Sequence, residues 1–534
     1  MITCYENARV FTGGVQAADC FVVGEDGCFA FVGSAKDAHT AYPHAQRVDL
    51  GGRFVCPGFN DTHLHLLDLG CALSQAQLQE HTDSLAHVLD AVRDFAAAHP
   101  DEPFICGRGW NHDFFTDERR YPTRGELDAA CPDRPCLITR ACGHVAVANS
   151  RALALCGIDG HAPEVSGGLV ATDASGRPNG VLEENAISLV SRHRPTPDRA
   201  GITARLLRAM QTVNGYGITS VHSDDLNTLE VPFEEVIAAY GELEAEGRMT
   251  VRVTQQSQLP EPALLECFLS AGYKTGWGDE WYRIGPLKLI TDGSLGARTA
   301  LLRAPYADAP ETAGTALFDP QTLDALVMRA HSAGMQIAAH AIGDRAADLV
   351  LDAIERAQAA CPRENARHGI VHAQVLDESQ AARMGRMGMH AYIQPIFLDY
   401  DTQIVFPRLG KRALHAYPAA SLRQSGVTFS GGSDSPVEPA NVLRGIQCAV
   451  TRMPVTHPAD APYLPQEALS LRDALLCFTA GGAYASFEEH SKGRIAPGML
   501  ADFTVLGIDP FETDPKWLHR IPICGVYVGG RQVH

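Results

Sequence analysis

The feature that most limits the fold of this chain is an alternation of short apolar runs with longer segments rich in Ala, Leu and Glu. Segments such as TLDALVMRAHSAG and SQAARMGRMG have the residue pattern of helices, and the apolar runs have the length of buried strands. The predicted strands are FVCPGFNDTHLH, GITSVHSDD, MTVRVTQQ, RIGPLKLITDG, MQIAAHAIGD, RHGIVHAQVL, MHAYIQPIF and GVTFSGGSDSPV. Eight such units predict an α/β chain with a (β/α)8 barrel, whose catalytic groups lie at the carboxyl ends of the strands.

The two ends of the chain differ from the middle. ARVFTGG and CFVVGEDGCFAFVGSA near the start, and ICGVYVGGRQVH at the end, predict short antiparallel strands between glycine-rich turns. We expect residues 1–54 and 493–534 to pair into a small composite β-sandwich, with the barrel at 55–492. Roughly 150 residues separate the first two barrel strands, far more than a βα connection needs. This spacing predicts an inserted subdomain of strands and loops at about 70–215, placed to cover the barrel mouth.

Charge and cysteine content limit the partners and the compartment. The 63 acidic and 44 basic residues give a formal net charge of −19, which argues against binding to nucleic acid or to an anionic membrane. A small-molecule partner is expected instead. The fifteen cysteines form no CxxC pair, and we find neither a signal peptide nor an apolar run of about 18 residues. The sequence therefore predicts a reduced, cytoplasmic protein without a transmembrane helix.

The stretch CPGFNDTHLHL holds two histidines separated by one leucine. Residues two apart in a strand point to the same face, so His63 and His65 project together at the mouth of the predicted barrel. Such a pair is suited to holding one cation. The alternative is two surface imidazoles beside a turn, since the chain contains 22 histidines.

Three further polar residues follow or end predicted strands. His340 and His372 each end an apolar run, where a single histidine is commonly a hydrogen-bonded core residue. Asp434 follows the last strand, where a helix cap or a turn residue is the alternative. Each residue alone leaves both interpretations open.

Lys288 lies inside an apolar strand, where an ammonium group carries a large desolvation cost. A neutral amine at this position is nucleophilic and can add carbon dioxide, giving a carbamate whose oxygens bridge two metal ions. The alternatives are a head group that reaches solvent and an ion pair with Asp292.

Together these residues place four imidazoles, one lysine and one carboxylate at the ends of predicted strands one, four, five, six and eight. Closure of a barrel brings those ends onto one rim. Nitrogen and oxygen ligands of this kind suit zinc and similar divalent ions. The joint pattern is much more specific for a metal centre than any single member.

The same segments resemble the amidohydrolase superfamily. The resemblance covers nearly the whole chain and is carried by PGFNDTHLH, the lysine strand, AHAIGD, GIVHA, GSDSPVEP and GRIAPGMLADFTVL. KLITDGSLGARTA resembles the branch that contains N-substituted formamide deformylases. The resemblance implies a metal-dependent hydrolase with a barrel and a composite β-sandwich. Its ligand positions fall on His63, His65, His340, His372 and Asp434, and Lys288 matches the position that many members carboxylate.

The ligand set leads to a hypothesis for the reaction. One or two divalent ions, most simply zinc, activate a water that attacks a carbon–nitrogen bond of an amide, an N-formyl compound or a cyclic amide, with Asp434 as general base. A metal-dependent decarboxylase or deaminase is the alternative chemistry, and a non-catalytic binding protein is a further one. Members of the family are expected to form homodimers.

Substrate contacts are implied by three motifs that resemble the surroundings of the active site in this branch, GRGWNHD, ACGHVAVANS and GART. They give Trp110, His144 and Arg298 as candidate substrate-binding residues, and Asp292 of the lysine motif is a fourth. Packing or surface charge is the alternative role for each.

Overall fold

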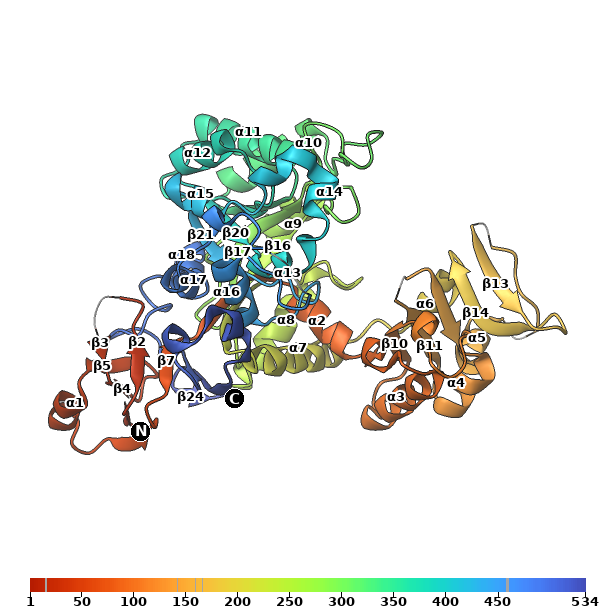
Figure 1. The fold of residues 1–534 in the computed structure, drawn as a ribbon, viewed down its shortest axis with the longest axis horizontal. Coiled ribbons are helices and arrows are strands. Elements are labelled where there is room, and N and C mark those ends of the chain that lie inside the picture. The colour runs from red at the N-terminus through yellow and green to blue at the C-terminus, as the bar shows by residue number, and fades with distance from the viewer. Residues whose placement is uncertain (15–16, 142, 159, 166, 458–460) are drawn as a thin grey trace. The chain divides into compact units, whose positions relative to one another are not determined.

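The computed structural model describes residues 1–14, 17–141, 143–158, 160–165, 167–457 and 461–534 (Figure 1). The chain forms two compact units. The first comprises Met1–Asp68 and Leu206–His534, and the second comprises Leu69–Arg205. The chain passes from one unit to the other inside helices α2 (Leu66–Leu73) and α7 (Arg199–Asn214).

The first unit contains the predicted barrel. Eight strands pair in parallel, each with its neighbour in sequence order. They are β8 (Phe59–Leu64), β15 (Ile218–Ser223), β16 (Arg252–Gln258), β17 (Tyr282–Ile290), β18 (Ile337–Ala341), β19 (Gly369–His372), β20 (His390–Ile393) and β21 (Thr428–Gly431). The first and last strands meet, because Thr62 donates to the Gly431 carbonyl (3.0 Å) and the Asp434 N–H to the His63 carbonyl (2.7 Å). The predicted (β/α)8 fold is confirmed.

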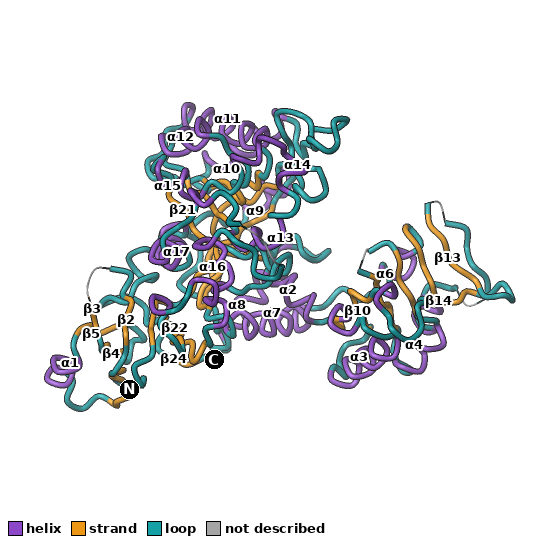
Figure 2. The backbone as a smooth tube through the Cα atoms, viewed as in Figure 1, coloured by secondary structure: helices purple, strands orange, loops and turns teal. Residues whose placement is uncertain are grey.

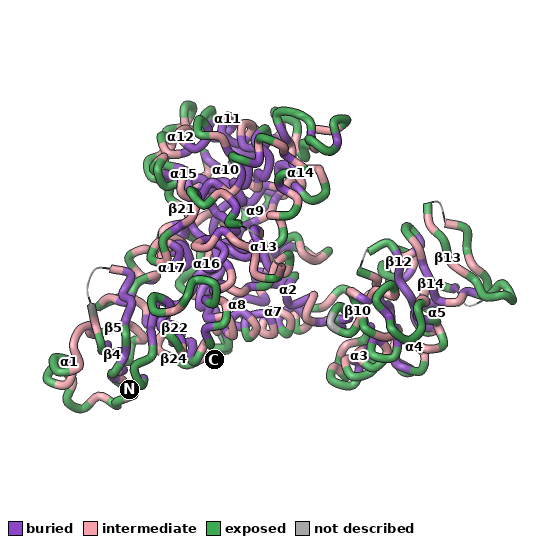
Figure 3. The backbone as a smooth tube through the Cα atoms, in the orientation of Figure 1, coloured by how far each residue is buried: buried purple, intermediate pink, exposed green. Residues whose placement is uncertain are grey.

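Helices follow the strands and enclose the barrel (Figure 2). Their starts are set locally: Asp319 caps α10, and Asp377 with Gln380 forms a capping box at α12. Apolar side chains line the barrel and the inner helix faces, so the buried segments of this unit lie at its centre (Figure 3). The helices after the strands are α8 (Phe233–Ala245), α9 (Pro262–Ser270), α10 (Pro320–Ser332), α11 (Asp344–Ala360), α12 (Glu378–Arg386), α13 (Leu398–Asp401), α14 (Val405–Leu409), α15 (Ala419–Gln424), α16 (Val442–Thr451), α17 (Leu471–Cys477) and α18 (Ala480–Ala485).

FVCPGFNDTHLH, predicted as one strand, is two strands in different sheets. β7 (Phe54–Pro57) pairs with β22 (Phe503–Leu506), and β8 pairs with β15. The break falls at Gly58, where a Cβ atom would lie 2.2 Å from the Thr219 hydroxyl oxygen. Only glycine allows the backbone to pass this close to β15 as it turns from one sheet into the other.

Strands from both ends of the chain form two sheets. The four-stranded sheet has the order β5-β4-β1-β6, and the six-stranded sheet has the order β24-β23-β22-β7-β2-β3. Aromatic rings of Phe21, Phe29, Phe503 and Tyr527 pack between them. Two pairings, β1 with β6 and β2 with β7, are parallel, which differs from the predicted antiparallel pattern. The remaining bounds are β1 (Thr3–Glu6), β2 (Arg9–Phe11), β3 (Ala17–Ala18), β4 (Cys20–Val23), β5 (Phe29–Gly33), β6 (Gln46–Asp49), β23 (Ile523–Val528), β24 (Arg531–Gln532) and helix α1 (Ala35–Ala41).

The second unit is built on a six-stranded sheet of order β13-β14-β12-β11-β10-β9. Helices pack against this sheet, which the sequence analysis did not predict for this segment; α3 begins at the Ser84 cap and buries Val88 and Val92. The bounds are β9 (Ala76–Gln77), β10 (Ile105–Trp110), β11 (Cys136–Arg140), β12 (Val145–Ala148), β13 (Gly168–Thr172), β14 (Pro178–Glu184), α3 (Leu85–Ala98), α4 (Arg124–Ala130), α5 (Ser150–Leu155) and α6 (Ile187–Ser191). Among the described residues of the whole chain, no helix combines the length and the apolar character needed to cross a membrane.

Candidate active site

The predicted ligands lie at the carboxyl ends of the barrel strands, where a (β/α)8 barrel carries its chemistry. His63 lies in β8 and His65 directly after it. Lys288 and His340 lie near the ends of β17 and β18, His372 is the last residue of β19, and Asp434 follows β21. Segments far apart in sequence therefore contribute side chains to one rim.

Asp434 is the centre of this group. One of its carboxylate oxygens lies 3.3 Å from Nε2 of His63 and 3.2 Å from Nε2 of His65. Nε2 of His63 in turn lies 3.0 Å from Nζ of Lys288. Four of the six predicted ligands are thus linked by direct polar contacts.

His372 and His340 complete the group. The His372 ring centroid lies 5.5 Å from that of His63 and 4.5 Å from that of His340. Nε2 of His340 donates to the Gly293 carbonyl (3.1 Å) and lies 3.2 Å from Asp292. Three buried residues, His63, His372 and Asp434, each offer a ligand atom within 4.8 Å of the other two.

Polar neighbours fix the orientation of the imidazoles. Nδ1 of His63 donates to the Gln256 side chain (2.7 Å), Nδ1 of His372 to the Gln394 side chain (2.8 Å), and Nδ1 of His65 to the Asp224 carbonyl (3.2 Å). Each of these bonds directs the other ring nitrogen toward the centre of the group. Metal-binding histidines are held by such partners.

The backbone is strained at two of these positions. His372 and Asp434 have φ angles of +73° and +62°, in the left-handed region that residues with a Cβ seldom adopt. Such conformations persist where the surrounding structure holds them, and they cluster at functional sites. The strain aims both side chains at the group.

Burial sets the charge of the group. It lowers the pKa of the His63 imidazole to about 3 and, with the help of the neighbouring His340, that of His372 well below its usual value. Burial also lowers the pKa of the Lys288 amine, whose side chain is 1% exposed, although Asp224 and Asp434 oppose the change. Burial disfavours the Asp434 carboxylate, but its contacts with His63 and His65 outweigh burial and hold the pKa of Asp434 well below the usual range.

Asp224, which follows β15, is a site residue that the sequence analysis missed. It is buried, and neither of its carboxylate oxygens has a hydrogen-bond partner among the described residues. Burial raises its pKa to about 6, while Lys288 and His65 act in the opposite direction. The signal was present in the sequence, because GITSVHSDD ends a predicted strand with two carboxylates.

These side chains suit a divalent cation. Imidazoles and a carboxylate are donors that zinc and similar ions prefer, and the Nδ1 atoms of His63, His65 and His372 are already held by neighbours. The buried oxygens of Asp224 are a further group that accepts no hydrogen bond from the described residues. The donor set therefore fits a metal centre.

Asp292 and Arg298, predicted as substrate contacts, lie on the loop after β17. Asp292 is fully buried, and its carboxylate accepts N–H bonds from Leu301, Ile342 and Gly343 besides contacting His340. Asp292 thereby orients a candidate ligand. Arg298 forms a two-point ion pair with Asp308, at 3.1 and 2.9 Å.

Trp110 and His144, the other two predicted contacts, belong to the second unit. The Trp110 ring is buried in the apolar core of that unit and packs on Tyr121. Nδ1 of His144 lies 3.0 Å from the Glu184 carboxylate on an exposed edge. Their roles toward a substrate stay predictions.

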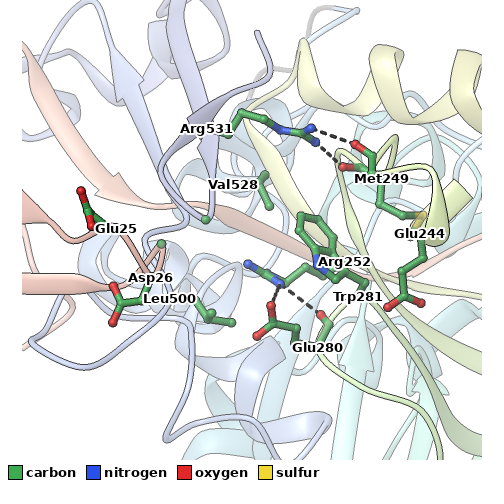
Figure 4. A pocket seen from close by; sticks show the side chains of 13 residues that line it. Glu25, Asp26, Glu244, Met249, Arg252, Glu280, Trp281, Leu500, Val528 and Arg531 are labelled. Atoms are coloured by element: carbon green, nitrogen blue, oxygen red, sulfur yellow. Dashed lines mark hydrogen bonds and ion pairs between the residues drawn. The ribbon is translucent and has the colours of Figure 1, made fainter. Parts of the chain in front are cut away.

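A cavity of about 340 Å³ lies at the opposite end of the barrel, where β16 and β17 begin (Figure 4). Arg252 faces it, pairs with Asp502 at 2.7 and 3.2 Å, and stacks on Trp281 at 4.4 Å. Arg531 donates to the carbonyls of Gly247 and Met249. Because these cations have partners and the amino ends of barrel strands serve stability, this cavity is not the catalytic site.

Known proteins share both the sequence and the fold. The model of the amidohydrolase family matches residues 46–534. The Bacillus subtilis protein YtcJ is 35% identical over 528 residues, covering 96% of this chain and 95% of its own. An N-substituted formamide deformylase of Arthrobacter pascens is 27% identical over 98% of this chain and 96% of its own. The crystal structure of an uncharacterized metal-dependent hydrolase from Pyrococcus furiosus matches with a TM-score of 0.79 and 28% identity, covering 96% of this chain and all of the other.

Proposed function

Because the chain belongs to the amidohydrolase family and is a metal-dependent hydrolase, we propose that it cleaves a carbon–nitrogen bond of a small molecule, in an amide, an N-formyl compound or a cyclic amide. The observation that carries this proposal is the convergence of His63, His372 and Asp434 within 4.8 Å. The similarity to an N-substituted formamide deformylase over nearly the whole chain supports the choice of bond.

We propose zinc as the cation, as one or two ions. His63, His65 and Asp434 would hold it from one side of the group and His340 and His372 from the other, with Lys288 between them. When bound, such an ion polarises a carbonyl and lowers the pKa of water toward about 7. Imidazole and carboxylate donors favour zinc over magnesium or calcium, which prefer oxygen ligands.

Asp434 supplies the acid–base chemistry. Its low pKa keeps the carboxylate ionised, so that it accepts a proton from the attacking water. The water oxygen bonds to the substrate carbonyl carbon, and the carbon–nitrogen bond then breaks. Asp434 returns the proton to the leaving nitrogen, which gives a carboxylic acid and an amine.

Lys288 is proposed to carry a carbamate. Burial lowers the pKa of its amine and so increases the fraction with a free electron pair. That pair bonds to the carbon of carbon dioxide, a proton leaves the nitrogen, and the product is a carbamate whose single negative charge is shared by two oxygens. Conversion of a buried cation into a metal ligand removes the desolvation problem that Lys288 poses in an apolar strand.

Substrate recognition is proposed to involve Trp110, His144, Asp292 and Arg298. Of these, Asp292 reaches the centre indirectly, through His340. Arg298 offers a guanidinium for a polar substrate group once its pair with Asp308 opens. We also propose that the protein is a homodimer, which light scattering after size-exclusion chromatography measures directly.

A product screen tests the proposed reaction. The protein is stripped with a chelator, reloaded with zinc or manganese, and given a panel of N-formyl, N-acyl and cyclic amide compounds. The expected result, only after reloading, is release of an amine with formate or another carboxylate, or, from a cyclic amide, one ring-opened product that carries both groups. Carbon dioxide release identifies a decarboxylase, and ammonia release from an amino-substituted ring identifies a deaminase; either product without amide cleavage contradicts the proposal.

A further inference from the structure

A second group of metal-binding side chains lies in the β-sandwich. Cys4 and Glu6 belong to β1, Cys20 is the first residue of β4, and His39 lies in helix α1. Cys4, Glu6 and His39 each offer a ligand atom within 4.8 Å of the other two. None of these residues belongs to the barrel rim.

The sheet register explains why these side chains meet. β1 and β4 pair antiparallel, with Cys4 opposite Val22 and Tyr5 opposite Phe21. Continuing this register places Glu6 opposite Cys20. Residues two apart share a face, so Cys4, Glu6 and Cys20 project from the same side of the sheet. Helix α1 covers that side, because Ala38 packs against the two cysteines.

The contacts have the dimensions of a cation site. The two sulfurs lie 3.4 Å apart, well beyond the roughly 2.05 Å of a covalent disulfide. Two thiolates on one tetrahedral zinc ion, each about 2.3 Å from it, would lie about 3.8 Å apart. Nε2 of His39 contacts the Glu6 carboxylate beside them. Three donors, from Cys4, Glu6 and His39, thus meet within 4.8 Å, and Cys20 adds a second sulfur 3.4 Å from that of Cys4.

Burial divides the site into two parts. The two thiols lie in a small apolar core with Val22 and Ala38, and they are almost fully buried. The side chains of Glu6 and His39 are 21% and 32% exposed, so they border solvent. A cation can enter from the exposed side and be held from beneath by sulfur.

We propose that Cys4, Cys20, His39 and Glu6 bind a zinc ion that fastens helix α1 to the β-sandwich. Four protein ligands complete the tetrahedral coordination, which is typical of structural rather than catalytic zinc. Thiolates select zinc over magnesium and calcium. The zinc binds as each thiol loses its proton to solvent. This site is independent of the function proposed for the barrel.

Cobalt substitution tests this proposal on the full-length protein. Only the sandwich site contains sulfur, so its Co²⁺ form shows thiolate-to-cobalt charge-transfer absorption in the near ultraviolet, whereas the barrel ligands offer only nitrogen and oxygen. We expect Cys4→Ser and His39→Asn each to abolish or strongly reduce this band and to lower the zinc content by one equivalent per chain. His39→Asn is the milder change, because the side chain borders solvent, and it keeps the test valid if Cys4→Ser fails to fold.

Cys28→Ser is the matched control, since Cys28 lies in the same β-sandwich and outside the cluster. It should leave both the band and the zinc content unchanged. The proposal is overturned if the wild-type protein shows no sulfur–cobalt band, if the variants keep the wild-type zinc content, or if non-reducing mass spectrometry finds Cys4 and Cys20 in a disulfide. Cys4→Ser and His39→Asn leave every proposed barrel ligand in place. Their zinc content therefore reports on the sandwich site even if the proposed catalytic centre fails its own test.

Discussion

Both ends of the barrel bury charged side chains, but Arg252 at one end and Asp224 at the other differ in their hydrogen-bond partners. At the amino ends of the strands, Arg252 is 1% exposed and is held by two contacts to Asp502 and by the Trp281 ring. At the carboxyl ends, Asp224 is equally buried, yet its oxygens have no hydrogen-bond partner among the described residues. A buried charge that the chain satisfies serves stability, and one that it leaves unsatisfied marks a place for a ligand.

The largest expected effect is at Lys288. Lys288→Ala should lose the barrel metal and all measurable activity, because it removes the proposed carbamate ligand. Short carboxylic acids such as formate or acetate should restore part of the activity by supplying the missing oxygens. Metal analysis and rate assays check this. Lys492→Ala is the control, since Lys492 is also buried but pairs with Glu488 at 2.8 Å; full barrel occupancy in the Lys288 variant would contradict the bridging role.

Asp434→Asn should lower kcat by roughly two to four orders of magnitude, the range expected of a general acid–base group. The amide keeps one oxygen as a ligand, so most of the metal should stay bound. Steady-state kinetics with metal analysis on the same sample separates the two effects. Turnover close to that of the wild type would remove Asp434 from the proton transfer.

At the other end, Arg252→Met should destabilise the protein by roughly 3 to 5 kcal/mol, because it leaves the Asp502 carboxylate buried without its cation. The kcat of the folded protein should not change. Adding Asp502→Asn should recover part of the loss, since a neutral amide still accepts the Gly529 N–H that Asp502 accepts at 2.7 Å. Denaturation midpoints give the stabilities; a fall in kcat at constant stability would break the contrast between the two ends.

The smallest expected effect is on the residues that orient the ligands. Gln256→Leu removes the acceptor for Nδ1 of His63 and should weaken metal binding by roughly 10- to 100-fold. Gln255→Leu is the matched control, because the neighbouring Gln255 contacts Ser223 and Tyr282 instead. Titration with a competing chelator measures both affinities. Equal losses in the two variants would mean that general packing, and not the orientation of His63, is responsible.

Much of the fold was predictable because helical and strand spacings differ along the chain. Eight apolar runs separated by helical segments led to the barrel, and polar residues at their ends led to the rim. The break at Gly58 was not predictable, since both halves of FVCPGFNDTHLH have the composition of a buried strand. The sheet that each half joins is decided by tertiary contacts.

The site was predictable where a residue is unusual for its place, as with a lysine in an apolar strand. Gln256 in β16 and Gln394 directly after β20 carry no such signal, because the role of a neutral amide depends on the histidine ring beside it. The substrate contacts at Trp110, His144, Asp292 and Arg298 stay predictions, because a strand pattern does not place the side chains of loops.

The seam between β8 and β21 joins the first barrel strand to the last, and residues 369 positions apart in sequence, His65 and Asp434, meet across it. During synthesis, His63 and His65 are therefore added to the chain long before Asp434, whose carboxylate completes the site. A nascent chain that ends before β21 has an open ring of strands, and one that ends before Asp434 has an incomplete set of donors. The proposed barrel cation therefore finds its full set of ligands only after synthesis has passed Asp434.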